Sequence, residues 1–279
     1  MGEKIWLRNI TCLDHASIDS RGFVVGGSCN VSVILDGEVV GDEAVVIDFS
    51  KAKKACKAAI DDKLTGYDHK LILYPESQVE VHHIKSHTLQ LSTPEAEIIC
   101  PEDAVAIVTT TLEAELERII DTALEKEFPL ARVSSKVILS RKGFTEHDAL
   151  NFTYVHGLKC SSSFGCQNMN HGHRSFVEVQ GKDAMVISYE IAQHLNRTVF
   201  VSRENITFED GTRLGIGYNT ERGYFRTLYS KNHKIVVLDT ETTAEFLVEY
   251  VRNMFPQYMV PGITILISEG LMKGAVVNE

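Results

Sequence analysis

The chain has 279 residues, of which 44% are hydrophobic and 24% charged, a composition that predicts a folded globular protein with one large or two small cores. The formal net charge of −10 disfavours a nucleic-acid backbone or an anionic membrane as the main partner, because both need a basic surface. Apolar runs are far shorter than the roughly 20 residues that cross a bilayer, no secretory h-region is recognised near the N-terminus, and the six cysteines form no CxxC pair. We therefore expect a cytoplasmic protein with free thiols.

The first half of the sequence predicts strands combined with two helices. Apolar residues at helical spacing predict helices over residues 50–64 and 112–128, and Pro129 ends the second. Three apolar segments before the first helix and one after the second predict strands over residues 5–13, 29–35, 44–47 and 136–140.

The second half repeats this plan. Strands are predicted over residues 150–155, 174–179, 184–187 and 263–267, with one helix from about Ser188 and another over 243–255. The chain is therefore expected to hold two tandem repeats, residues 1–143 and 144–279. Residues 208–229, rich in glycine and charge, have no place in this plan and look like an insertion.

The two repeats differ in their chemistry when they are aligned. Residues 9–14 align with 151–156, and residues 27–37 align with 171–181. The second repeat has histidine at three positions where the first repeat has Asp14, Gly27 and Cys29. One metal ion per chain, in the second repeat, is the expectation.

Those three histidines are His156, His171 and His173. His171 and His173 are two residues apart at the start of a strand, so both side chains project from one face, and Gly172 allows close backbone packing. His156 ends the preceding strand. Three neutral nitrogen ligands with a fourth position open are typical of a catalytic zinc site. The alternative is a chance His-x-His pair, each ring solvated or bonded to backbone.

Cys166 lies five residues before His171, in a loop rich in glycine and asparagine. A thiol beside zinc has a lowered pKa, so its thiolate could accept a proton at neutral pH. Cys166 could instead be a fourth zinc ligand or a loop cysteine without chemistry. Cys160 is a weaker candidate for the same role.

The run Cys166-Gln-Asn-Met-Asn-His-Gly-His173, with His156 upstream, resembles the signature of the 6-pyruvoyl-tetrahydropterin synthase and 6-carboxytetrahydropterin synthase family. Two first-half segments, Asp48-Phe-Ser-Lys and Tyr67-Asp-His-Lys-Leu-Ile-Leu73, resemble another segment of that family. The resemblance covers nearly the whole chain. It implies an α+β fold of two tandem T-fold repeats, each an antiparallel four-stranded sheet with two helices on one face. It also implies that protomers close edge to edge into a barrel, as a homo-oligomer.

The resemblance assigns roles to particular residues. It implies that Cys166 is the thiol base, that Asp68 and His69 form a proton relay, and that Glu269 anchors the pterin ring. Glu241 matches a further acidic position. A carboxylate suits a pterin because its two oxygens can accept hydrogen bonds from a ring N–H and the 2-amino group together. Without the resemblance, Asp68 would be a cap and His69 an ordinary histidine at a helix end.

The implied function is that of a zinc-dependent 6-carboxy-5,6,7,8-tetrahydropterin synthase-type lyase acting on 7,8-dihydroneopterin triphosphate, an activity that serves deazapurine (queuosine) synthesis. The alternatives are triphosphate elimination of the 6-pyruvoyl type, or a T-fold binding or scaffold protein that keeps the metal without turnover. Usual family members have one domain per chain, whereas here the Asp-His pair and the zinc ligands lie in different repeats. The active site can then form either within one chain or where two chains meet, and we favour the contact between chains.

Overall fold

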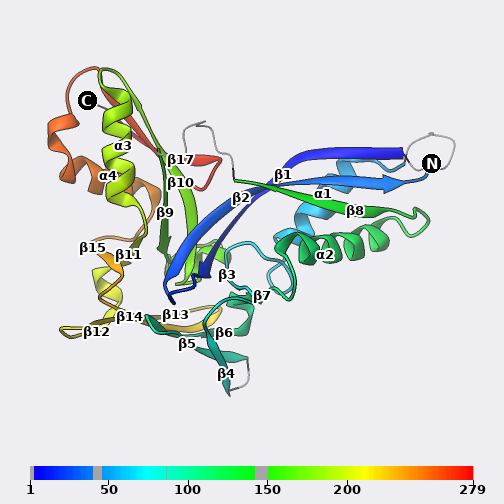
Figure 1. Ribbon diagram of the computed structural model, residues 1–279, viewed down its shortest axis with the longest axis horizontal. Coiled ribbons are helices and arrows are strands. Elements are labelled where there is room, and N and C mark those ends of the chain that lie inside the picture. Colours follow the sequence, from blue (N-terminus) through cyan, green and yellow to red (C-terminus); the bar gives the residue numbers. More distant parts are fainter. Residues whose placement is uncertain (1–2, 40–45, 86, 142–149, 279) are drawn as a thin grey trace.

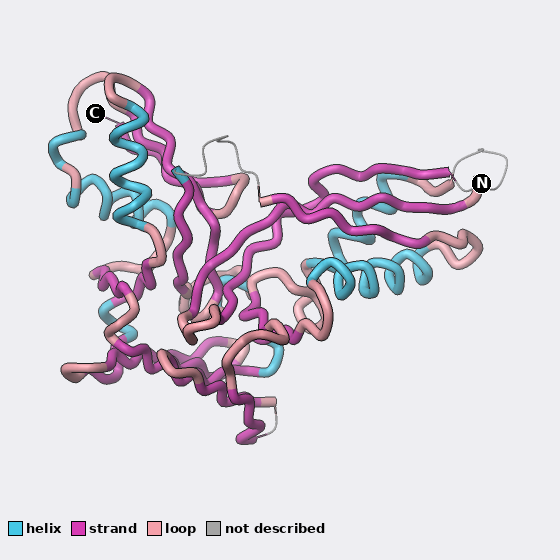
Figure 2. Tube along the Cα trace, in the orientation of Figure 1, coloured by secondary structure: helices cyan, strands magenta, loops and turns pink. Residues whose placement is uncertain are grey.

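The structure is a computed structural model that describes residues 3–39, 46–85, 87–141 and 150–278. It is an α+β protein with three sheets and four α-helices in the described part of the chain (Figure 1). Figure 2 shows that the helices lie in two pairs, each beside a different sheet, while the third sheet has no α-helix next to it. Among the described residues, no helix has both the length and the apolar character needed to span a membrane.

The first sheet and its two helices come from the first half of the chain. Their bounds are β1 Glu3–Ile18, β2 Val24–Gly37, α1 Phe49–Ile60, β3 Lys70–Leu73, β7 Val105–Ile107, α2 Leu112–Glu127 and β8 Ser134–Ser140. The strand order is β7-β3-β1-β2-β8. β1, β2 and β8 pair antiparallel, whereas β3 pairs parallel with β1 and β7 parallel with β3.

The second sheet and its two helices come from the second half. Their bounds are β9 Asn151–His156, β10 His171–Gln180, α3 Ala184–Leu195, β11 Thr198–Ser202, β15 Lys234–Leu238, α4 Ala244–Met254, β16 Thr264–Glu269 and β17 Lys273–Asn278. The strand order is β15-β11-β9-β10-β16-β17. The neighbouring strands β9, β10, β16 and β17 pair antiparallel. β11 and β15 extend the sheet in parallel beyond β9.

The expected pair of four-stranded antiparallel sheets is therefore wrong in detail. The sheets have five and six strands in the described residues, and both mix parallel with antiparallel pairs. The added strands β3, β7, β11 and β15 are only three to five residues long, and β3 and β11 are buried along their whole length, so they show no alternating pattern in the sequence. The order of the other elements is the same in both halves, except that β17 has no counterpart among the described residues of the first half. The division into repeats at residue 143 stays a prediction, and that boundary lies outside the described residues.

The third sheet joins the two halves. Its strands are β4 Glu80–Lys85, β5 Thr88–Ser92, β6 Ala96–Pro101, β12 Ile206–Glu209, β13 Arg213–Thr220 and β14 Gly223–Ser230. β14, from the unassigned stretch 208–229, pairs antiparallel with β6 of the first half. This pairing gives the stretch a structural place that the sequence pattern did not reveal.

Helix predictions were the most accurate. α2 and α4 fall within one residue of the expected 112–128 and 243–255, and the Asp48 side chain caps α1 by accepting the Lys51 N–H at 2.7 Å. The predicted strand at 184–187 is wrong, because these apolar residues form the first turn of α3. The predicted strand at 44–47 lies partly outside the described residues, and Val46 and Ile47 form a bend.

Three apolar cores follow this layering. One lies between the first sheet and α1 and α2, and includes Leu116 and Ile120. Another lies between the second sheet and α3 and α4, and includes Ile191 and Val251. The third core includes Ala16 of β1, Val155 of β9 and Ile98 of the third sheet, so it binds both halves together. Burial of this kind contributes about 25 cal/mol per Å² of apolar surface, which holds the two halves in a defined relation.

Candidate functional site

The three histidines predicted as metal ligands meet in the structure. His156 ends β9 and lies directly opposite His171, the first residue of β10, in the antiparallel register. His173 follows on the same face of β10, and its Nε2 lies 3.0 Å from Nε2 of His156. All three side chains are buried, and one ring nitrogen from each lies within 4.8 Å of the others.

The other nitrogen of each ring faces an oxygen that can only accept a hydrogen bond. Nδ1 of His156 lies 2.8 Å from the Thr242 carbonyl oxygen, and Nδ1 of His171 lies 2.7 Å from the Asn168 carbonyl oxygen. Nδ1 of His173 lies 3.2 Å from a carboxylate oxygen of Asp14. The carbonyl oxygens place the proton on Nδ1 of His156 and His171, and the Asp14 carboxylate favours the same tautomer of His173. The Nε2 lone pairs are then directed at one another.

This arrangement fits a metal ion. Nε2 of His171 is buried with no hydrogen-bond partner among the described residues, and two facing lone pairs 3.0 Å apart repel unless a cation lies between them. Ligand nitrogens around tetrahedral zinc are about 3.3 Å apart, close to this separation. Burial, with the nearby His173, lowers the pKa of His156 to about 3, and burial also lowers the pKa of His171. These two rings are thus held in the neutral form that binds metal.

The close backbone packing expected at Gly172 is confirmed. A Cβ atom on Gly172 would lie 2.6 Å from the Cα of Gly26, and one on Gly26 would lie 2.0 Å from the Tyr154 carbonyl oxygen. β2 of the first half therefore lies against β9 and β10 with backbone touching backbone. This contact brings residues of the first half up to the histidine cluster.

Cys166 and the Asp68-His69 pair lie beside the same cluster. One ligand atom each of His69, Cys166 and His171 lies within 4.8 Å of the other two, so this set is a second candidate metal group. Nδ1 of His69 lies 2.6 Å from Asp68 Oδ2, and a Cβ on Gly165 would lie 2.7 Å from His69 Cβ. His69 also has a left-handed backbone, with φ of 56°, a conformation that is costly for a residue with a side chain.

The contact between His69 and Cys166 changes both proton affinities. Burial alone would raise the pKa of the Cys166 thiol, but the neighbouring His69 lowers it below its ordinary value. Burial would likewise lower the pKa of His69, but Asp68 and Cys166 raise it well above its ordinary value. The two shifts together favour a thiolate beside an imidazolium ion.

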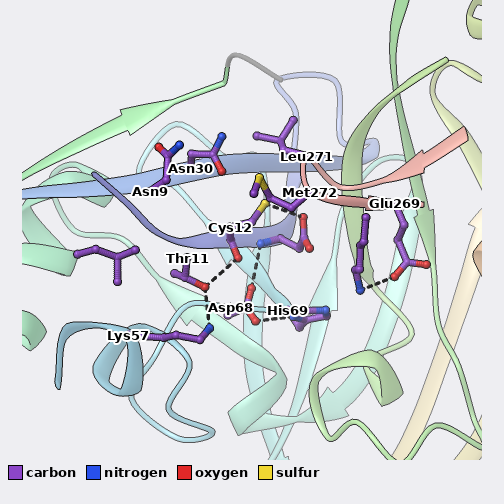
Figure 3. A pocket seen from close by; sticks show the side chains of 13 residues that line it. Asn9, Thr11, Cys12, Asn30, Lys57, Asp68, His69, Glu269, Leu271 and Met272 are labelled. Atoms are coloured by element: carbon purple, nitrogen blue, oxygen red, sulfur yellow. Dashed lines mark hydrogen bonds and ion pairs between the residues drawn. The ribbon is translucent and has the colours of Figure 1, made fainter. Parts of the chain in front are cut away.

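A pocket of about 370 Å³ opens next to this group (Figure 3). Asp68, His69, Glu269 and Lys273 are among the residues that line it. Figure 3 shows Asp68 and His69 next to one another and Glu269 apart from them. Glu269 Oε1 lies 2.6 Å from the Lys273 ammonium. Burial would raise the pKa of Glu269, but positive charge around it, including that of Lys273, lowers the pKa below its ordinary value and so favours the ionised carboxylate.

Glu241 is not among the residues that line this pocket. It lies near Cys160, and burial raises the pKa of its carboxyl group. Its neighbour Thr242 is the residue that accepts the His156 Nδ1 hydrogen bond. Cys160 is exposed and is not in either candidate metal group.

Residues from both halves of one chain complete this site. His69 and His171 have ring centroids 5.2 Å apart, and the Asn168 side chain donates to the His69 carbonyl oxygen at 3.0 Å. The favoured arrangement, in which the Asp-His pair and Cys166 meet across a contact between two chains, is therefore wrong, because they meet within one chain. The sequence did not indicate that Asp14, Asn168 and Lys273 take part in the site. Asp14 and Asn168 contact partners that are distant in sequence, and Lys273 lies outside any recognised motif.

Known proteins give few parallels for this chain. A scan against models of protein families finds no match, and a search of curated proteins finds none either. Among solved structures, a catalytic residue mutant of Plasmodium vivax 6-pyruvoyltetrahydropterin synthase aligns with 16% identity and a TM-score of 0.38, covering 51% of this chain and 99% of that chain. A further crystal structure of that Plasmodium vivax enzyme aligns with 16% identity and a TM-score of 0.35, with the same coverage. Similarity at this level supports no conclusion about function.

Proposed function

We propose that this protein is a zinc-dependent lyase of the 6-carboxytetrahydropterin synthase type, acting on 7,8-dihydroneopterin triphosphate. The observation that carries the proposal is the meeting of three Nε2 lone pairs with the Cys166, His69 and Asp68 group beside the Glu269 pocket. Histidines that only stabilise a core have no reason to direct unprotonated nitrogens at one another. The family signature in the sequence supplies the substrate class.

His156, His171 and His173 would hold the zinc ion, with the fourth position open. Bound zinc would supply a Lewis acid for the hydroxyl oxygens of the substrate side chain. The oxygen acceptors at Thr242, Asn168 and Asp14 keep the three rings in the required tautomer. The fold therefore orients the three ligands before the ion binds.

Cys166 would act as the base. Its sulfur accepts a proton from a carbon of the substrate side chain, because the neighbouring His69 favours the thiolate. His69 then exchanges the proton with the substrate or product through Nε2, while Asp68 stabilises the imidazolium ion at Nδ1. In this arrangement the thiol and the imidazole act as one proton-carrying pair.

Glu269 would bind the pterin ring through its ionised carboxylate, and Lys273 keeps that carboxylate charged. Glu241, the second acidic residue that the resemblance implies, does not line the pocket, and its part in substrate binding stays a prediction. The pocket volume of about 370 Å³ is within the range of small-molecule sites.

Turnover of the zinc-loaded protein tests this function. Incubation with 7,8-dihydroneopterin triphosphate should release both tripolyphosphate and acetaldehyde. Release of tripolyphosphate without acetaldehyde would assign the 6-pyruvoyl type of reaction instead. Tight binding of the substrate without either product would overturn the enzymatic proposal and favour a binding or scaffold protein.

The metal is tested separately by composition. The purified protein should contain about one zinc ion per chain, and His171→Ala should lose it because two nitrogen ligands seldom hold zinc tightly. Elemental analysis by mass spectrometry measures both. His82→Ala, on an exposed strand outside the site, is the matched control and should keep its zinc. Full zinc content in His171→Ala would refute the three-histidine site.

A further inference from the structure

Asp14 is a buried carboxylate that the first half of the chain contributes to the histidine cluster of the second half. Its side chain is 6% exposed and lies 3.2 Å from Nδ1 of His173, whose side chain is 1% exposed. Burying an ionised carboxylate is costly unless it is paired or hydrogen-bonded. A buried carboxylate at this position therefore needs a partner that offsets the cost.

The surroundings of Asp14 hold its carboxylate in one orientation. The Ser28 hydroxyl donates a short hydrogen bond to the same oxygen, Oδ1, that faces His173. Ser28 Oγ in turn accepts the backbone N–H of Arg174 at 2.9 Å, so it is fixed from both sides. Gly270 adds a steric limit, since a Cβ there would lie 2.7 Å from Asp14 Oδ1.

The backbone of Asp14 also holds the Asp68-His69 pair. The Asp14 N–H donates to Asp68 Oδ1 at 2.9 Å, and the His69 N–H donates to the Asp14 carbonyl oxygen at 2.6 Å. The second bond stabilises His69 in its left-handed conformation. One residue thus contacts a metal-ligand ring with its side chain and the proton-carrying pair with its backbone.

We infer that Asp14 is a positioning residue for the zinc ion, which orients His173 through Nδ1 and holds that ring at a fixed place relative to His69. Carboxylates that accept the second N–H of a zinc-bound histidine fix its tautomer and make it a stronger ligand. Asp14 aligns with His156 in the repeat comparison, so the first half supplies a supporting carboxylate where the second half supplies a ligand. This inference rests on the proposed zinc site.

The test is the zinc affinity of Asp14→Asn, measured by competition with a chromophoric chelator. Asparagine has nearly the same shape but no charge, and the expected result is an affinity about 10- to 100-fold lower than that of the wild type. The d–d absorption spectrum of Co²⁺ bound in place of zinc should also change, because the His173 ligand is altered. Asp36→Asn, an exposed carboxylate on β2, is the matched control and should change neither readout.

The outcomes separate the two proposals. If the wild type binds zinc tightly and Asp14→Asn binds it equally well with an unchanged cobalt spectrum, the inference about Asp14 is wrong and the zinc site stands. If the wild type binds no zinc, the zinc site fails and the role of Asp14 fails with it. Should Asp14→Asn not fold, Ser28→Ala decides the matter: loss of the hydroxyl frees the carboxylate, so several-fold weaker zinc binding supports the inference and unchanged binding refutes it.

Discussion

The chemistry of single residues in the site depends on how each imidazole uses its two nitrogens. In His156, His171 and His173 an oxygen acceptor takes Nδ1, which leaves Nε2 for an ion. In His69 a carboxylate also takes Nδ1, but Nε2 faces a thiol. The surroundings of Nε2 therefore decide whether a histidine is a metal ligand or, as proposed for His69, a proton carrier.

Replacement of Cys166 by alanine separates the roles of base and ligand. The three histidines hold zinc without the thiol, so Cys166→Ala should keep about one zinc ion per chain. Turnover should fall by about 10²- to 10⁴-fold, the usual contribution of a general base. Elemental analysis and the tripolyphosphate assay, run on the same preparation, measure both. Joint loss of zinc and turnover would make Cys166 a fourth ligand, which the second candidate group of His69, Cys166 and His171 also permits.

At the level of residues, the sequence predicted the histidine cluster because strand alternation and the His-x-His spacing place ligands on one face. Asp68 and His69 were reached only by family resemblance, since nothing local distinguishes them from a cap and a helix-end histidine. Asp14 looked like a missing ligand in the repeat alignment. Its contact with His173 spans more than half of the chain and depends on the close approach of Gly26 and Gly172, which no local pattern encodes.

The element with the least expected role is the hairpin of β13 and β14. Arg222 lies in the turn between these two strands, and its side chain is buried. It donates to the Phe164 carbonyl oxygen at 3.1 Å and to Asp103 at 3.2 Å. The Tyr218 hydroxyl on β13 donates to the Gln167 carbonyl oxygen at 3.1 Å. Residues on both sides of Cys166 are thus held by the hairpin, which gives this inserted segment a part in the site.

Replacement of Arg222 tests this part. Arg222→Gln should lower the free energy of unfolding by about 3 kcal/mol, because the buried guanidinium is lost and the partly buried Asp103 carboxylate loses its charge partner. Turnover should fall while zinc content stays at one per chain, since the histidines lie outside the loop. Chemical denaturation and elemental analysis measure these effects. Arg213→Gln, which breaks an exposed ion pair with Glu97 on the same sheet, is the control and should cost about 1 kcal/mol or less.

At the level of elements, long periodic segments were predicted well and short ones were not. α2 and α4 have apolar faces over three or more turns, whereas β7 has three residues and β3 has four. The third sheet could not be predicted because its central pair, β6 with β14, joins segments from different halves. Pairing between distant strands depends on the folded arrangement of the cores and leaves little trace in either segment.

For the molecule as a whole, buried neutral histidines make the metal-free protein sensitive to acid. Burial lowers the pKa of His15 from 6.5 to about 4, despite the opposing effect of Asp14. The unfolded chain therefore binds a proton at higher pH than the folded chain, so stability falls as pH drops from about 6.5 toward 4. Protonation linked to this one residue should lower the free energy of unfolding by about 2 kcal/mol between about pH 7.5 and pH 5.

Urea unfolding with a metal chelator present, at both pH values, measures this loss. His15→Gln should show a loss smaller by about 2 kcal/mol than the wild type, while His82→Gln, an exposed histidine, should match the wild type. Equal losses in all three proteins would show that His15 is not buried in its neutral form.

The assembly of the site within one chain leads to a last prediction. His69 comes from the first half and Cys166 from the second, yet they contact one another in a single chain. The variants His69→Ala and Cys166→Ala each damage one member of every such pair. Mixing them therefore cannot bring an intact His69 to an intact Cys166, however the chains associate.

Subunit exchange makes this a direct measurement. The two inactive variants are mixed under conditions that exchange subunits, exchange is verified by native mass spectrometry, and tripolyphosphate release is followed. Activity should stay at the level of the separate variants. Wild type mixed with the double variant His69→Ala/Cys166→Ala is the control, and its activity should follow the wild-type fraction because each chain carries its own site. Recovery of a substantial part of wild-type activity in the first mixture would mean that the two residues meet across chains, and would overturn the single-chain site.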